Sequence, residues 1–303
     1  MLRKILTVIL IIVFLGSSAV LILQHVQQQD AAQAHQAAEE LASVGGVTTP
    51  PQVQSAQSAE AAVNPLSQLL ASPLQAAPET VQEVLSHLEQ IPTAIAQSLD
   101  ITAWLPVLED SNAAALKDID LAALKEINAD VIGWFLIPGT TISYPLLQGT
   151  DNEYYLNYTW DNRESFVGSI FMDHTANPGL SDFNTIIYGH NLGDSHMFST
   201  LTKFKSQSYY QSHPYFYIVN AQGIFRYQII ASYKAAADST VFRIRFAGPD
   251  SKQAYLDQVM QHSVIDTGIT PTADDRIVTL STCVRGEANN RWIVQARLEG
   301  QLG

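Results

Sequence analysis

Cys283 is the only cysteine among 303 residues, and its surroundings favour a chemical role. It ends an apolar, β-branched run that begins at Arg276, and a second such run begins at Arg291. Without a second cysteine in the chain, the thiol is either a small buried hydrophobe or a reactive group. A cysteine nucleophile acts as the thiolate, and a free thiol with a pKa of about 8.5 is mostly protonated at neutral pH. The site therefore needs a nearby cation or base.

Arg291 is the candidate cation. If the two apolar runs pair as antiparallel strands, Cys283 and Arg291 face each other near the mouth of a hairpin, roughly 5–6 Å apart at the backbone. The intervening residues 284–290 have a length that suits a loop. An arginine there would stabilise the thiolate and, later, the oxyanion of a tetrahedral intermediate. The alternative is a surface arginine at the start of a strand.

His190 is the candidate base among eight histidines. It directly follows the apolar segment 184–189, which ends in glycine, so it lies at a junction between a strand and a loop, where sites are commonly built. A hydrogen-bonded structural histidine is the alternative. His174 and His196 occur nearby, but no HxxxH or HxH spacing supports a metal site. We therefore predict neither a metal nor an organic cofactor.

The N-terminal residues predict a membrane anchor. Residues 5–23 contain no charged side chain and are long enough to cross a bilayer as one helix. Arg3 and Lys4 precede this segment, so the positive-inside rule places residues 1–4 in the cytoplasm and the rest of the chain outside. The expected location is thus the cell membrane, with a single-pass anchor and an extracellular folded domain. A cleaved signal peptide is the alternative.

Composition divides the remainder into three parts. Residues 24–77 are rich in Ala, Gln, Pro and Ser and have no aromatic side chain, which predicts a flexible tether. Residues 78–112 predict a helical stalk, and residues 113–303 predict the folded domain. The net charge is −13 and no basic cluster follows the N-terminus, which argues against a nucleic-acid partner.

The folded domain reads as mainly β, with a helical prelude over residues 113–127. Apolar runs bounded by turn residues predict strands near 131–137, 142–147, 168–172, 185–188, 215–219, 225–233, 277–282 and 292–298. Two helices interrupt them, one carrying Met197, Leu201 and Phe204 and another running from Pro249 to about His262. Many short strands with few helices indicate a closed or nearly closed β-barrel.

Several segments together resemble the sortases, and class B in particular. These segments are residues 185–198, 279–283 and 291–294, supported upstream by residues 130–145, 149–157 and 168–173. The resemblance covers about residues 113–298 in order. It implies an eight-stranded sortase-type barrel with N-terminal helices and a helix in the connection before the cysteine strand.

The resemblance also implies roles for particular residues. Cys283 would be the nucleophile, His190 the general acid and base, and Arg291 the group that binds the oxyanion and orients substrate. The substrate groove would use Asn152, Leu156, Tyr188 and Ser281. The chain departs from the family pattern at Val284, where an acidic residue often follows the cysteine, and in a shorter connection from Cys283 to Arg291.

The expected activity is therefore that of a class B sortase-like cysteine transpeptidase of a Gram-positive bacterium, within the thiol peptidase class. Its partners would be surface proteins or pilins with a C-terminal sorting motif, Asn-Pro-x-Thr or Leu-Pro-x-Thr, and an amine from a peptidoglycan precursor or a pilin lysine. Two alternatives stay open. One is an exported cysteine peptidase that uses water as the acceptor, and the other is a non-catalytic surface scaffold.

Overall fold

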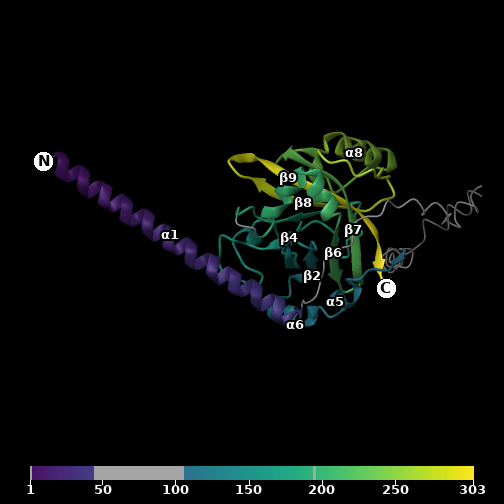
Figure 1. Cartoon of the computed structure of the whole chain (residues 1–303), viewed down its shortest axis with the longest axis horizontal. Helices are drawn as coiled ribbons and strands as arrows, with labels where there is room; N and C mark the ends of the chain where they lie inside the picture. The colour runs from purple at the N-terminus through teal and green to yellow at the C-terminus, as the bar shows by residue number, and fades with distance from the viewer. Residues whose placement is uncertain (1, 44–105, 194–195) are drawn as a thin grey trace, which may run out of the picture. The chain divides into compact units, whose positions relative to one another are not determined.

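Short apolar segments of this chain pair into one sheet that closes on itself (Figure 1). The computed structural model describes residues 2–43, 106–193 and 196–303. Eight strands form the barrel in the order β9-β7-β6-β2-β3-β4-β5-β8, and β8 pairs with β9 to close it. The expected eight-stranded, mainly β architecture is confirmed.

The strands have the following bounds. They are β2 (Val131–Leu136), β3 (Ser143–Leu147), β4 (Ile170–Met172), β5 (Asn184–Tyr188), β6 (Tyr215–Asn220), β7 (Gly223–Ala236), β8 (Ile277–Val284) and β9 (Glu287–Leu302). A ninth strand, β1 (Val107–Leu108), pairs in parallel with the end of β9. Strands β7 and β9 are longer than the hydrophobic pattern predicts, because they pair with each other from Ile224 to Ala236.

Alternation along the strands buries both of their faces. In β2, Phe135 points into a cluster with Phe198 and Phe216, whereas Trp134 joins a second cluster with Leu116 and Leu124 of the N-terminal helices. A third cluster lies between the barrel and α8 (Pro249–His262). Successive side chains of a strand point to opposite faces, so one strand can serve two apolar layers.

The other helices are short. They are α5 (Ala113–Lys117), α6 (Leu121–Ile127), η2 (Tyr154–Leu156), η3 (Ser199–Lys205), α7 (Gln207–Ser212) and η4 (Thr240–Phe242). The predicted helical prelude is two helices rather than one. Asp120 causes the break, because its carboxylate accepts hydrogen bonds from the backbone N–H groups of Ala122 and Ala123 and so starts a new helix.

The hairpin of β8 and β9 corrects the loop expected at residues 284–290. Val284 pairs with Glu287, so only Arg285 and Gly286 form the turn. The remaining residues belong to β9, where Asn290 pairs with Ala236 of β7 and the Asn289 carbonyl accepts from the backbone N–H of Ala237. A shift of register between Cys283 and Val284 accommodates the unequal lengths of the two strands.

The N-terminal segment differs from both predictions made for it. A single helix, α1, covers Leu2–Leu41, so residues 24–41 are helical where composition predicts a tether. The prediction of a single-pass membrane anchor over residues 5–23 is corrected, and with it the membrane location of an extracellular domain. Within the described residues, no helix has both the length and the apolar character needed to cross a bilayer. Residues 44–105, with most of the predicted tether and stalk, lie outside the described residues.

Small side chains explain why the C-terminal part of α1 contacts the barrel. Ala31, Ala34, Ala38 and Ala42 recur on one helix face and are buried. The Trp160 indole N–H donates to the Ala34 carbonyl oxygen at 2.7 Å. His35 lies on the same side and stacks on Tyr144, with ring centroids 4.1 Å apart. Alanines allow this close approach, which the composition alone did not indicate.

We predict that contact between α1 and the barrel weakens in mild acid. Burial, and then the charge of His196, lowers the pKa of His35 to about 4. Because the folded pKa lies below the unfolded value, the stabilisation is full above about pH 6.5 and is lost as the pH falls toward 4. A folded pKa of about 4 against an unfolded pKa of 6.5 corresponds to a loss of roughly 2 kcal/mol in the free energy of unfolding at pH 5.

The measurement is urea unfolding at pH 7 and pH 5 for the wild type and for His35→Gln. In His35→Gln, the free energy of unfolding should fall by about 2 kcal/mol less between pH 7 and pH 5 than it does in the wild type. Exposed His25 on the same helix provides the matched control, and His25→Gln should behave as the wild type. An identical pH dependence in His35→Gln and the wild type would contradict the prediction.

Candidate active site

The three predicted catalytic residues come together where β5, β8 and β9 adjoin. Strands β5 and β8 are parallel neighbours with Tyr188 opposite Ser281. His190 and Cys283 each lie two residues beyond that pair, at the same end of the sheet. Cys283 is in turn the register partner of Arg291 on β9. The thiol is exposed, so a substrate can reach it.

The imidazole of His190 has a fixed orientation. Its Nε2 lies 2.7 Å from the carbonyl oxygen of Leu156. A carbonyl oxygen can only accept, so Nε2 carries the hydrogen of the neutral ring and Nδ1 is the nitrogen with a lone pair to accept a proton. Gly168 makes this contact possible, since its φ is +63° and a Cβ there would lie 2.8 Å from the Leu156 oxygen and 2.9 Å from His190 Cδ2.

Asn191 is a functional candidate that the sequence did not reveal. Its Nδ2 donates to the Cys283 carbonyl oxygen at 2.9 Å. On the other side, the backbone N–H of Phe198 donates to the His190 carbonyl oxygen, also at 2.9 Å. The first bond ties the loop after β5 to the cysteine strand, and the second closes that loop on itself. The only available signal was its place next to His190, because a contact across 92 positions leaves no local pattern.

Arg291 carries its positive charge on the residue of β9 that pairs with Cys283. Its Nη1 donates to the carbonyl oxygens of Ala288 and Asn290, at 2.9 and 3.1 Å. The ion pairs found among the described residues involve other cations, including Arg226, Lys234 and Arg297. The guanidinium is therefore held at the hairpin by carbonyl groups, which orient it without neutralising its charge.

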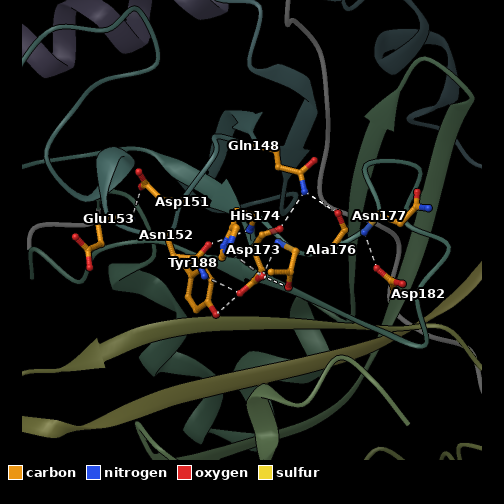
Figure 2. Close-up of polar contacts among 11 residues, drawn as sticks. Gln148, Asp151, Asn152, Glu153, Asp173, His174, Ala176, Asn177, Asp182 and Tyr188 are labelled. Atoms are coloured by element: carbon orange, nitrogen blue, oxygen red, sulfur yellow. Dashed lines mark hydrogen bonds and ion pairs between the residues drawn. The ribbon is translucent and has the colours of Figure 1, made fainter. Parts of the chain in front are cut away.

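Two of the predicted substrate residues meet at a buried carboxylate, as Figure 2 shows. Asp173 Oδ2 accepts from Asn152 Nδ2 at 2.8 Å and from the Tyr188 hydroxyl at 3.0 Å. Its Oδ1 accepts from the backbone N–H and the hydroxyl of Thr175, at 2.9 and 2.7 Å. Asn152 is further fixed by its Oδ1, which accepts from the backbone N–H of His174. Asp173 thus positions both residues, a role the sequence did not suggest.

The protonation of this cluster follows from its contacts. Burial acts to raise the pKa of Asp173, but hydrogen bonds from Thr175, Asn152 and Tyr188 bring it below its ordinary value. Burial, followed by the Asp173 charge, raises the pKa of Tyr188. The carboxylate is therefore ionised and the phenol keeps its proton.

Leu156 and Ser281, the other predicted substrate residues, adjoin the same region. Leu156 contributes the carbonyl that binds His190, and Ser281 is buried opposite Tyr188. Within the described part of the chain, no group of three or more His, Cys, Asp or Glu side chains is placed to hold a metal ion. The chemistry available at this site is that of an exposed thiol with an oriented imidazole and a guanidinium.

Comparison with known proteins agrees with this arrangement. The family model of the sortase domain matches residues 135–299. Sortase B of Staphylococcus aureus (strain NCTC 8325 / PS 47) is 36% identical over 178 residues, which are 58% of this chain and 73% of that protein. Sortase B of Listeria monocytogenes serovar 1/2a (strain ATCC BAA-679 / EGD-e) is 33% identical over 205 residues, 63% of this chain and 83% of that protein.

A solved structure of the Staphylococcus aureus sortase B–substrate complex matches with a TM-score of 0.57 and 30% identity, covering 74% of this chain and 99% of that one. The chain belongs to the sortase family, and its relatives place it in class B. Sortases are cysteine transpeptidases, so the family accounts for an exposed thiol beside a histidine and an arginine.

Loss of the Asp173 carboxylate should destabilise the protein. Asp173→Ala leaves the partly buried donors of Asn152 and Tyr188, and the donors of exposed Thr175, without their acceptor, and we expect a loss of about 1–3 kcal/mol in the free energy of unfolding. Urea unfolding measures it. Asp238→Ala provides the control, because Asp238 is exposed in a turn and should change stability by less than about 0.5 kcal/mol. Equal stabilities of the two variants would contradict the assigned role.

Asn191 should act as a positioning residue. Asn191→Ala removes the hydrogen bond to the Cys283 carbonyl, and we expect kcat for hydrolysis of a sorting-motif peptide to fall about tenfold with KM within about twofold. Asn157→Ala, at an exposed asparagine, should leave both parameters unchanged. A variant that changes only KM, or only the thermal midpoint, would show that Asn191 does not orient the nucleophile.

Proposed function

We propose that this protein cleaves a C-terminal sorting motif after its threonine and transfers the upstream protein to an amine. The observation that supports this proposal is the meeting of Cys283, His190 and Arg291 at one end of a sortase barrel. The reaction class would be acyl transfer through a thioester, with no cofactor. The donor would be a surface protein or pilin, and the motif either Asn-Pro-x-Thr or Leu-Pro-x-Thr.

The first half-reaction would form a thioacyl enzyme. The Cys283 thiol passes its proton to His190 Nδ1 as the sulfur attacks the threonine carbonyl carbon, and Arg291 stabilises the oxyanion of the tetrahedral intermediate. As the intermediate collapses, the peptide bond breaks and His190 Nδ1 donates a proton to the leaving amine. The hydrogen bond from Nε2 to the Leu156 carbonyl supports this assignment, because it leaves Nδ1 as the exchanging nitrogen.

The second half-reaction would reverse these roles. An acceptor amine attacks the thioester carbon while its proton passes to His190 Nδ1, and the sulfur leaves as the thiolate. The acceptor would be an amine of a peptidoglycan precursor or a pilin lysine. Water in its place would give hydrolysis only, which is the reaction of a peptidase.

The donor groove would lie along Asn152, Leu156, Tyr188 and Ser281. Support comes from their clustering around Asp173 and His190, and from the similarity to a sortase B that has been solved with its substrate. Asn152 and Tyr188 would present polar groups whose orientation Asp173 fixes. Such fixed groups favour one bound geometry of an extended peptide.

The proposal predicts that sorting-motif peptides are cleaved and that an added amine appears in the product. Cys283→Ala should abolish turnover, and His190→Gln should reduce it by at least about a thousandfold. Quenched fluorescent peptides with both motifs, incubated with and without triglycine and resolved by mass spectrometry, provide the measurement. His262→Gln, on the exposed end of α8, serves as the histidine control and should retain activity.

The outcomes separate the candidate functions. Cleavage without amine in any product would leave a cysteine peptidase and reject the transpeptidase. If the wild type cleaves neither peptide, both the transpeptidase and the cysteine peptidase are rejected. Turnover by Cys283→Ala equal to that of the wild type would reject the proposed nucleophile.

A further inference from the structure

An open pocket of about 380 Å³ lies beside the catalytic hairpin. Its walls come from three elements: the loop after β5, the 3-10 helix η3 and the turn between β8 and β9. The wall includes Asn191, Gly193, Ser199, Lys203, Val284 and Arg285.

The pocket adjoins the reacting groups on a side that the predicted donor residues do not line. Asn191 follows His190 and binds the Cys283 carbonyl, and Val284 follows Cys283. None of the residues assigned to the donor groove is part of the pocket wall. A transferase with two substrates needs a second approach to the thioester carbon, and this pocket is placed to provide one.

The pocket carries concentrated positive charge in an acidic protein. Lys203 and Arg285 both line it and are exposed, while the whole chain has a net charge of −13. The ion pairs found among the described residues leave both of them without a carboxylate partner. Two cations in one pocket favour a carboxylate or another anion, and an arginine can bind a carboxylate with two parallel hydrogen bonds.

The wall beneath Arg285 is well defined. The Arg285 guanidinium lies over Gly193, whose φ of +80° favours glycine. Ser199 Oγ accepts from the backbone N–H groups of Leu192 and Gly193, at 2.9 and 3.1 Å. Lys203 lies on the facing helix with its Nζ 5.9 Å from the centre of the Tyr209 ring. The cations therefore extend from ordered backbone.

We infer that this pocket binds the acceptor substrate, and that the acceptor is an amine that carries a carboxylate, held by Arg285 and Lys203. The inference rests on the proposed function and specifies its second substrate. With the carboxylate bound, the neutral amine forms a bond to the thioester carbon, the carbon–sulfur bond breaks, the electron pair stays on Cys283 and the amine proton passes to His190 Nδ1.

Matched acceptors test the inference. Triglycine and triglycine amide differ in the terminal carboxylate, and glycine and glycine amide place that group closer to the amine. Each is supplied at the same concentration of neutral amine, and the ratio of aminolysis to hydrolysis is measured. The wild type should prefer the acid over the amide by about tenfold in at least one pair, and the preference should decline as salt is added.

Variants locate the effect. Arg285→Ala and Lys203→Ala should each reduce the acid-to-amide preference toward one, and Arg285→Lys should restore only part of it. Lys205→Ala and Arg245→Ala remove exposed cations that do not line the pocket, and both should keep the wild-type preference. Since every value is a ratio of two acceptors for one variant, a general loss of activity does not imitate the result.

The outcomes distinguish this inference from the function on which it rests. If the wild type uses both acceptors equally, or if Arg285→Ala retains the preference, the carboxylate site is wrong while transpeptidation stands. If no amine enters any product, the transpeptidase and its acceptor site are both wrong. A preference lost in Lys205→Ala or Arg245→Ala as well would show a diffuse charge effect and would also overturn the site.

Discussion

The register of three adjacent strands is the constraint on which the site depends. Parallel pairing of β5 with β8 sets Tyr188 opposite Ser281, and antiparallel pairing of β8 with β9 sets Cys283 opposite Arg291. A slip of one residue in either ladder would turn every side chain to the other face of the sheet. Barrel closure opposes such a slip, since β9 is also paired with β7 along most of its length. The fold thus fixes the relative positions of thiol and guanidinium through backbone hydrogen bonds.

A strand can place a residue but cannot orient an imidazole that lies beyond its end. For His190, that orientation comes from hydrogen bonds made by the loops. The Leu156 carbonyl fixes the tautomer, Gly168 leaves room for that carbonyl, and Asn191 joins the loop to Cys283. Buried Asp173 orients Asn152 and Tyr188 through hydrogen bonds. Burial of its negative charge is unfavourable, and four hydrogen bonds to the carboxylate stabilise it. Rigid strands and oriented loops together produce a preorganised site.

The sequence predicted the parts of this structure that depend on local pattern. Apolar alternation located the barrel strands, and the spacing of Cys283 and Arg291 indicated their pairing. It did not predict the roles of Asn191 or Asp173, because each acts through partners distant in sequence. The connection at 284–290 was expected to be a loop, since Asn and Gly favour turns, yet Val284 pairs with Glu287 and Asn290 pairs with β7, so only Arg285 and Gly286 form the turn. Tertiary pairing overrode local preference there.

The N-terminal segment is a second case in which tertiary contacts decide a structure that local composition does not predict. Composition alone indicated a tether after residue 23, because alanine and glutamine bury little surface. Four alanines at helical spacing nevertheless form a face that fits against Trp160 and Tyr144. A small side chain contributes little apolar area, but it lets the helix backbone approach its neighbour closely. A hydropathy scale does not measure this closeness of approach.

An exposed thioester raises a problem that the charges of this protein help to explain. Cys283 is accessible to solvent, so water at molar concentration competes with any amine for the acyl group. An amine can prevail only if binding raises its effective concentration and holds it near the carbon it attacks. Much of an acidic surface would repel a carboxylate-bearing acceptor, whereas Lys203 and Arg285 would attract it into the pocket beside the catalytic hairpin. In such a protein, local charge beside the thiol would decide between transfer and hydrolysis.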